Sequence, residues 1–176
     1  SRDIAQKFNL DFESPDFFLT PEPLIQKNFA RIMSLKDGKK KMSKSDPSDL
    51  SRINLKDTKD EIVNKIKKAK TDNYDMPTNV SKLNNRPEIE NLLSIYSSLT
   101  NQNIKNTIEK FSNKNFSEFK GELAEIVVEK ISPISDEIKR LEKDPKFIDD
   151  ILLNGSKKAE KMARLKVEEL KKIVGF

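Results

Sequence analysis

The sequence contains no cysteine and no histidine among its 176 residues. Without cysteine, the chain can form no disulfide framework, no zinc cluster and no cysteine nucleophile, and this composition fits a reducing compartment. No apolar run approaches the roughly 20 residues needed to cross a bilayer, and we expect no signal peptide before the first predicted helix. We therefore expect no membrane partner.

Charge is abundant and unevenly placed. Charged residues make up 36% of the chain and hydrophobic residues 35%, so much of the surface should be helix exterior. The formal net charge is +5. The segment 36–72 alone holds twelve Lys or Arg against seven Asp or Glu, an excess equal to that of the whole chain. This concentration predicts an anionic partner, although a basic skew of the whole surface is the alternative.

The segment Lys41-Met42-Ser43-Lys44-Ser45, here called the KMSKS loop, places two ammonium groups and two hydroxyls within five residues. Lysine is a compact charge on a flexible stem, so it can follow a pyrophosphate as its charge grows. Serine hydroxyls and backbone N–H groups add neutral donors. The pattern indicates a mobile loop that grips phosphates, with Gly38 as the flexible point before it. The alternative is a solvated lysine-rich turn.

The first 55 residues have the mixed pattern of an α/β protein. Ile4, Ala5 and Phe8 fit one helix face, while 17–19 and 29–35 are candidates for buried strands. A phosphate loop after such a strand lies at the carboxyl edge of a sheet, where open α/β folds bind ligands.

From residue 57 onward the apolar spacing is helical. Thr58 and Glu61 form a capping box, after which Ile62, Val63, Ile66 and Ala69 share one face and the lysines point elsewhere. Pro87 suits a first helical turn. Further helices are expected over 104–111, over 117–141 with a kink at Pro133, and from Pro145 to a stop at Asn154-Gly155, followed by a final helix with apolar residues at 159, 162, 163, 167, 170 and 173.

The stretch from Ala30 through the KMSKS loop to Asp46-Pro47 closely resembles the ATP-binding loop of bacterial-type tryptophanyl-tRNA synthetases, which are class I aminoacyl-tRNA synthetases. The resemblance covers nearly the whole chain. It continues in Arg2-Asp3-Ile4-Ala5, Phe8-Asn9, Pro21-Glu22-Pro23-Leu24-Ile25, Lys68-Ala69-Lys70-Thr71-Asp72, Asn91-Leu92-Leu93-Ser94-Ile95-Tyr96 and Leu123-Ala124-Glu125-Ile126-Val127-Val128-Glu129.

This resemblance implies a mainly α fold in which residues 1–55 end a Rossmann-like nucleotide-binding domain and residues 56–176 form a helical anticodon-binding region. It also implies a cytoplasmic homodimer that joins tryptophan to its tRNA with ATP and Mg²⁺. The family places a His-containing ATP motif and the amino-acid pocket in an amino-terminal half. Because this chain lacks histidine, we expect it to be the carboxy-terminal portion, inactive by itself.

The resemblance also assigns residues. ATP contacts fall to Ile32, Lys41, Met42, Ser43, Lys44 and Ser45, with Lys44 the main catalytic cation and Lys41 a supporting one. No metal ligand is assigned. Basic helix faces are candidates for contact with tRNA phosphates: Lys65, Lys67, Lys68, Lys157, Lys158, Lys161 and Arg164.

Two other interpretations stay open. A free-standing basic helical module that binds RNA would explain the charge but not the KMSKS loop. A related class I synthetase, above all that for tyrosine, would share the loop and diverge downstream.

Overall fold

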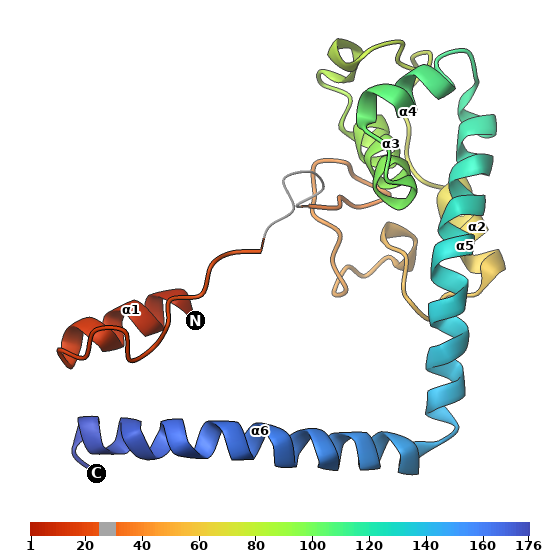
Figure 1. The fold of residues 1–176 in the computed structure, drawn as a ribbon. Helices are drawn as coiled ribbons and strands as arrows, with labels where there is room; N and C mark the ends of the chain where they lie inside the picture. Colours follow the sequence, from red (N-terminus) through yellow and green to blue (C-terminus); the bar gives the residue numbers. More distant parts are fainter. Residues whose placement is uncertain (25–30) are drawn as a thin grey trace. The chain divides into compact units, whose positions relative to one another are not determined.

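The computed structural model describes residues 1–24 and 31–176. Their elements follow in the order α1 (Arg2–Asp11), the 3₁₀ turn η1 (Asp49–Ser51), α2 (Lys59–Lys67), the 3₁₀ turn η2 (Val80–Leu83), α3 (Pro87–Thr100), α4 (Ile104–Phe111), α5 (Phe116–Glu142) and α6 (Pro145–Val174) (Figure 1). The described residues are thus mainly helical, as predicted. None of their helices is both long and apolar enough to span a membrane.

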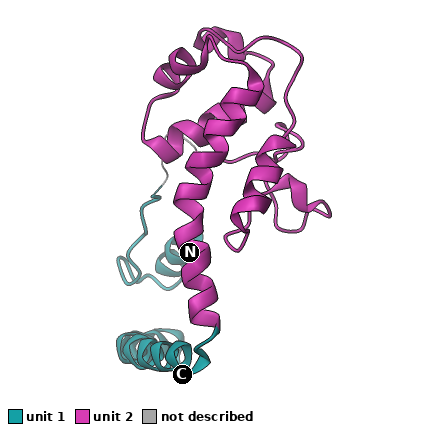
Figure 2. Cartoon of the chain, turned by 90° about the vertical axis from the view of Figure 1, so that its right-hand side faces the viewer, with its two compact units in different colours: residues 1–25, 143–176 teal, residues 26–142 magenta. Residues whose placement is uncertain are grey.

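The chain divides into two compact units, one made of residues 1–25 and 143–176 and the other of residues 26–142 (Figure 2). Each is described by itself below. The expected division into the end of a Rossmann-like domain, residues 1–55, and a helical region, residues 56–176, stays a prediction.

The larger unit is held together by one hydrophobic core. Helix α2 packs on α5, and α3 packs on both α4 and α5. The rings of Tyr96, Phe111 and Phe119 meet edge to face, with centroids 4.8 to 4.9 Å apart. The core comprises Leu35, Ile62, Ile66, Ala69, Met76, Leu83, Ile89, Leu92, Leu93, Tyr96, Ile108, Phe111, Phe119, Leu123, Ala124 and Val127.

Helix starts in this unit follow the local sequence signals. Thr58 Oγ1 accepts a hydrogen bond from the Glu61 N–H, and the Glu61 carboxylate accepts one from the Thr58 N–H, so the predicted capping box is present. Pro87 occupies the first turn of α3, where its missing N–H costs no intrahelical bond. These caps explain why α2 and α3 begin at the predicted positions.

The two predicted strands are absent from the described residues. Residues 17 and 18 lie in a bend, and Leu19 is largely exposed. In the run 29–35, Phe29 and Ala30 lie outside the described residues, as does Ile25, while Met33 forms only an isolated antiparallel bridge with Lys41. The buried Asn91 side chain occupies the remaining backbone groups of Met33, accepting from its N–H and donating to its C=O at 2.9 and 2.8 Å.

The predicted stop at Asn154-Gly155 is wrong, because α6 continues through both residues. An interior glycine costs a helix only about 1 kcal/mol relative to alanine, and the neighbouring Leu, Lys, Ala and Glu residues favour the helix. Helix α5 continues through Pro133, as the predicted range 117–141 requires, and the kink at Pro133 stays a prediction.

The smaller unit contains an aromatic cluster. Phe8 on α1 packs against the rings of Phe12, Phe17 and Phe18 at centroid distances of 4.7 to 5.4 Å. The ammonium of Lys166 on α6 lies 3.7 Å from the centroid of Phe17. No residue of α6 is fully buried, so its predicted apolar face is largely exposed within the described residues.

Candidate functional site

The KMSKS loop begins where residues 32–34 and 40–42 pair in a short antiparallel arrangement. The Met42 N–H donates to the Ile32 carbonyl at 3.0 Å, and the Ser34 N–H donates to the Lys40 carbonyl at 2.8 Å. This pairing brings Ile32 beside the start of the loop, although Ile32 and Met42 are ten positions apart in the sequence.

Gly38, in the turn between the paired segments, is a point of close packing. A Cβ added there would lie 2.4 Å from the Pro87 carbonyl carbon and 2.5 Å from the Glu88 nitrogen, both backbone atoms at the start of α3. Its φ lies outside the left-handed region. Glycine at position 38 is therefore required sterically, because only glycine allows this approach, while its role as the flexible point before the loop stays a prediction.

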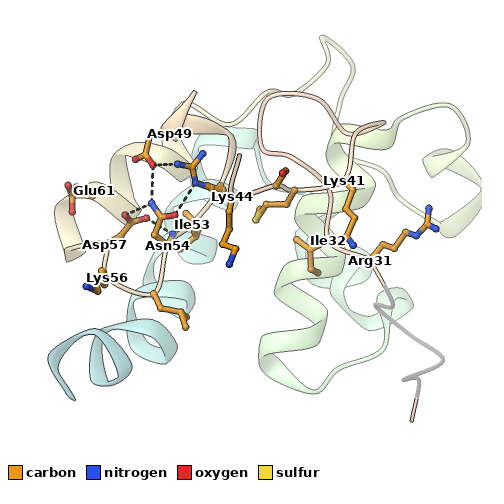
Figure 3. Close-up of a pocket in the computed structure, with 14 residues that line it drawn as sticks. Arg31, Ile32, Lys41, Lys44, Asp49, Ile53, Asn54, Lys56, Asp57 and Glu61 are labelled. Carbon is orange, nitrogen blue, oxygen red and sulfur yellow. Dashed lines mark hydrogen bonds and ion pairs between the residues drawn. The ribbon is translucent and has the colours of Figure 1, made fainter. Parts of the chain in front are cut away.

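The loop faces a cavity of about 970 Å³, a volume typical of ligand sites. Figure 3 shows Lys41 beside Ile32 and Arg31, and Lys44 nearer Asn54 and Ile53. The lining residues are Arg31, Ile32, Lys41, Met42, Ser43, Lys44, Asp49, Arg52, Ile53, Asn54, Leu55, Lys56, Asp57 and Glu61.

Five of the six predicted ATP residues line this cavity, and the sixth, Ser45, is joined to it through Ser43. The hydroxyls of Ser43 and Ser45 are 2.9 Å apart, and the Ser45 N–H donates to Ser43 Oγ at 3.3 Å. Lys41 and Lys44 are exposed, and neither ammonium has a hydrogen-bond or ion-pair partner among the described residues. Both cations are therefore available to an anion, and Met42 and Ile32 add apolar surface.

Sequence reasoning missed the residues that follow the loop and line the same cavity. Arg52 donates from Nη1 to the Asp46 carbonyl at 2.9 Å and from Nε to Asn54 Oδ1 at 3.0 Å. Its Nη2 lies 3.0 Å from Asp49 Oδ1. The available signal was the run of short polar and charged residues after the loop, including Asp46, Ser48, Asp49, Arg52 and Asn54, which offers local hydrogen-bond partners.

Lys65 does not point into solvent as expected. Its side chain is 4% exposed, and its ammonium lies 2.6 Å from Asp49 Oδ2 and 2.7 Å from Asp57 Oδ2. Burial disfavours the charged form, but the hydrogen bonds to Asp49 and Asp57 outweigh it, so the pKa of Lys65 is raised. The hydrogen bond from Lys65 in turn lowers the pKa of Asp49. With its charge neutralised locally, Lys65 is not available to tRNA phosphates.

The other candidate tRNA lysines differ from Lys65. Lys67 and Lys68 are exposed on and just after α2, and Lys157, Lys158 and Lys161 are exposed on α6. Arg164, also on α6, forms an ion pair with Glu160.

The exposed Tyr74 is one of the residues that line a second hollow of about 500 Å³. Arg86 donates twice to the Asp72 carboxylate at 2.7 Å, and its guanidinium carbon lies 5.5 Å from the Tyr74 ring centroid. The hydrogen bonds from Arg86 lower the pKa of Asp72. Asn84, Asn85 and Thr78 contribute neutral polar groups to the lining.

Comparison with known proteins gives these sites a context. Relatives named tryptophan–tRNA ligase include one from Caulobacter vibrioides, 47% identical over 176 residues, and one from Rickettsia felis, 46% identical over 181 residues. The alignments cover all of this chain but only 51% and 52% of those relatives. The chain thus spans about half the length of the relatives it matches.

Solved structures with a similar fold include two tryptophanyl-tRNA synthetases. The tryptophanyl-tRNA synthetase of Mycoplasma pneumoniae matches 99% of this chain and 51% of its own with a TM-score of 0.84 at 26% identity. That of Campylobacter jejuni, complexed with ADP and tryptophan, matches 99% of this chain and 52% of its own at 0.66 and 22%, which supports the fold alone. The family model of class I tRNA synthetases for tryptophan and tyrosine (W and Y) matches residues 1–132, and the chain belongs to that family.

Proposed function

We propose that this chain supplies the ATP-gripping loop and tRNA-binding helices of a tryptophan–tRNA ligase. The observation that carries the proposal is the KMSKS loop itself, which presents two ammonium groups without a partner among the described residues to a cavity of about 970 Å³. The names of the relatives favour tryptophan as the amino acid. The proposal includes a cytoplasmic homodimer as the working form of the complete enzyme.

In the proposed reaction, the tryptophan carboxylate attacks the α-phosphorus of ATP, and the bond to the β-phosphate oxygen breaks to release pyrophosphate. A hydroxyl oxygen of the tRNA then attacks the carbonyl carbon of the adenylate, so the tryptophanyl group passes to tRNA and AMP leaves. Negative charge grows on the leaving pyrophosphate in the first step. A cation that approaches this charge mainly in the transition state accelerates the reaction, whereas one bound equally in the ground state only tightens ATP binding.

The loop residues would divide this work. Lys44 is the main cation for the pyrophosphate and Lys41 supports it, while Ser43 and Ser45 exchange their mutual hydrogen bond for bonds to phosphate oxygens. Ile32 and Met42 offer apolar surface to the adenine.

Mg²⁺ belongs to the proposal as the companion of the ATP phosphates. The described residues contain no group of three His, Cys, Asp or Glu side chains that could hold a metal ion. Mg²⁺ that accompanies ATP is usually held by one or two carboxylates together with phosphate oxygens and water, so the proposal needs no such group.

The tRNA would meet the exposed basic residues Lys67 and Lys68 on one unit and Lys157, Lys158, Lys161 and the paired Arg164 on the other. Phosphate contacts supply affinity without sequence information. The hollow around Tyr74 offers a stacking surface beside neutral amides, which suits an unstacked base of a single-stranded loop.

The proposal is tested by amino-acid-dependent ATP–pyrophosphate exchange on the complete protein that contains this chain. We expect exchange with tryptophan and little with tyrosine. Exchange that depends on tyrosine would assign the protein to the other amino acid of the family. No exchange with either amino acid, together with intact RNA binding, would favour the free-standing RNA-binding module.

The same assay on residues 1–176 alone should show no tryptophan-dependent exchange, because the resemblance places the amino-acid pocket in another part of the enzyme. Turnover close to that of the complete protein would contradict this expectation.

A further inference from the structure

Lys65 is a buried cation with two acidic partners that come from different segments. Asp57 lies just before α2 and is itself buried, with a side chain 7% exposed, whereas Asp49 lies in the turn that follows the KMSKS loop and is 59% exposed. A lysine so deeply enclosed is uncommon unless it is paired. The two contacts therefore fix Asp49 relative to helix α2.

From Asp49 the contacts continue to the end of the loop. Asp49 Oδ1 lies 3.0 Å from Arg52 Nη2, and Arg52 Nη1 donates to the backbone carbonyl of Asp46 at 2.9 Å. Asp46 directly follows Ser45. An unbroken relay of charged contacts thus runs from α2 to the residue at which the KMSKS loop ends.

A second branch keeps the relay from shifting. Asn54 Nδ2 donates to Asp49 Oδ1 at 2.9 Å and to Asp57 Oδ1 at 3.1 Å, while the Asn54 N–H donates to Asp57 Oδ2 at 2.8 Å. Both acids that bind Lys65 are therefore also joined to each other through one amide. A network satisfied in this way favours a single arrangement of its members.

The relay ends beside the loop that carries the two ammonium groups without a partner among the described residues. The ammonium groups of Lys41 and Lys44 have no partner among the described residues, whereas the next segment is held at Asp46, Asp49 and Arg52. A loop that must close on a ligand needs a fixed end to close against, and a displacement of about 1 Å at that end can cost about 10²-fold in rate.

We propose that Lys65 is a positioning residue for the KMSKS loop, which acts through Asp49 and Arg52 to fix the loop exit and so to place Lys44 against the ATP phosphates. Lys65 itself touches no substrate. The role in ATP use rests on the proposed function, but the restraint on the loop exit does not.

The first test measures steady-state ATP–pyrophosphate exchange on the complete protein. Lys65→Met should lower kcat/KM for ATP by about 10- to 100-fold and leave KM for tryptophan within about twofold. Because Lys65→Met leaves Asp57 buried without its cation, which disfavours folding, Asp49→Asn provides a second variant. It leaves the buried Lys65–Asp57 pair intact but weakens the link to Arg52, and it should shift kcat/KM for ATP in the same direction.

Lys59→Met is the matched control. Lys59 is an exposed lysine on the same helix, with no ion-pair partner among the described residues, and its replacement should leave both parameters unchanged. Equal values of kcat/KM for ATP in wild type, Lys65→Met and Asp49→Asn would overturn the positioning role.

Hydrogen–deuterium exchange separates a loop restraint from a general loss of stability. In both variants, amides of residues 46–52 should exchange about tenfold faster, as expected when a local opening becomes easier, while peptides from α5 keep their wild-type rates. Unchanged exchange over 46–52, or an equal increase in α5, would overturn the inference. If wild type lacks tryptophan-dependent exchange, the proposed function fails, and this measurement still decides whether Lys65 restrains the loop exit.

Discussion

The KMSKS loop and the segment that follows it are both rich in charge, but they use it in opposite ways. In the loop, Lys41 and Lys44 are exposed and have no acidic partner among the described residues. In the following segment and α2, Arg52 and Lys65 are paired with carboxylates at 2.6 to 3.0 Å. The first arrangement leaves charge free for a ligand, and the second uses charge to hold the backbone.

This contrast shows that lysine density alone does not identify a binding surface. Lys65 and Lys68 lie within four residues of each other, yet one is buried between two acids and the other is exposed. The two lysines differ in their angular position around the helix axis. Lys65 is three residues after Ile62 and four before Ala69, so it lies beside the apolar stripe that faces α5.

The largest expected effect concerns the free cations of the loop. In the complete enzyme, Lys44→Ala should lower the rate of adenylate formation by ~10² to 10³, the scale associated with loss of one preorganised donor to developing charge. Lys41→Ala should act in the same direction but less strongly. Single-turnover assays with saturating tryptophan measure this rate.

Because the Lys44 ammonium has no partner among the described residues, its removal should leave the free energy of unfolding within ~0.5 kcal/mol of wild type. Urea titration is the control. Wild-type rates of adenylate formation in Lys44→Ala would refute the role of the loop as a phosphate clamp.

The next largest effect concerns Gly38, which precedes the KMSKS loop and packs against the start of α3. Gly38→Ala places a methyl group within 2.6 Å of backbone atoms of Pro87 and Glu88 at the start of α3, and backbone cannot rotate away. We expect a loss of about 1 to 3 kcal/mol in the free energy of unfolding, as for overpacked cores. Denaturant midpoints at fixed m-value measure it.

Gly121→Ala is the matched control for Gly38. Gly121 lies within α5, and a Cβ there meets no atom within 4 Å. This replacement should stabilise the protein by up to about 1 kcal/mol because alanine favours helix over glycine. Destabilisation of both variants by the same amount would show that the close approach to α3 is not the cause.

The sequence predicted the helical part of the larger unit well because its signals are local. The Thr58–Glu61 box and Pro87 mark helix starts through their own backbone geometry, and the apolar spacing of α3 and α4 matches their buried faces. The predicted strand at 17–19 failed because its rings pack with Phe8 instead of entering a sheet. The stop at Asn154-Gly155 failed because one unfavourable residue does not outweigh the helix formers around it.

The site was predicted only where its chemistry lies in consecutive residues. The KMSKS loop can be found from its lysines and serines, and the ATP contacts of the residues that it brings to the cavity remain predictions. The relay through Asp49, Arg52 and Asn54 depends on a turn whose geometry places their side chains together. Such a network is set by tertiary contacts and has no linear signature.

A smaller effect tests whether the ion pair between Asp72 and Arg86 stabilises the larger unit. The hydrogen bonds from Arg86 lower the pKa of Asp72 relative to the unfolded chain. A lowered carboxyl pKa stabilises the folded state above the unfolded value of about 3.9, and this contribution is lost as the pH falls through the folded value.

We therefore expect Asp72→Asn to cost about 1 to 2 kcal/mol at pH 7 and to differ less from wild type at pH 3. Urea unfolding at the two pH values measures the difference. A deficit that stays constant, or grows toward acid, would show that charge on Asp72 is not what stabilises this contact.

The smallest expected effect returns to the lysines of α2 and depends on salt. Lys67→Ala/Lys68→Ala removes two exposed ammonium groups, so the slope of log affinity for cognate tRNA against log salt should flatten by up to ~0.7 to 0.9 for each phosphate that is no longer neutralised. Lys65→Met removes the same kind of residue from the same helix, but Asp49 and Asp57 already neutralise that charge. Its slope should match wild type, while its use of ATP falls.

Titrations of tRNA at several salt concentrations compare the three proteins. A flattened slope in Lys65→Met would return Lys65 to the tRNA surface, and an unchanged slope in the double variant would leave Lys67 and Lys68 as a solvated face and shift the tRNA contact to Lys157, Lys158 and Lys161.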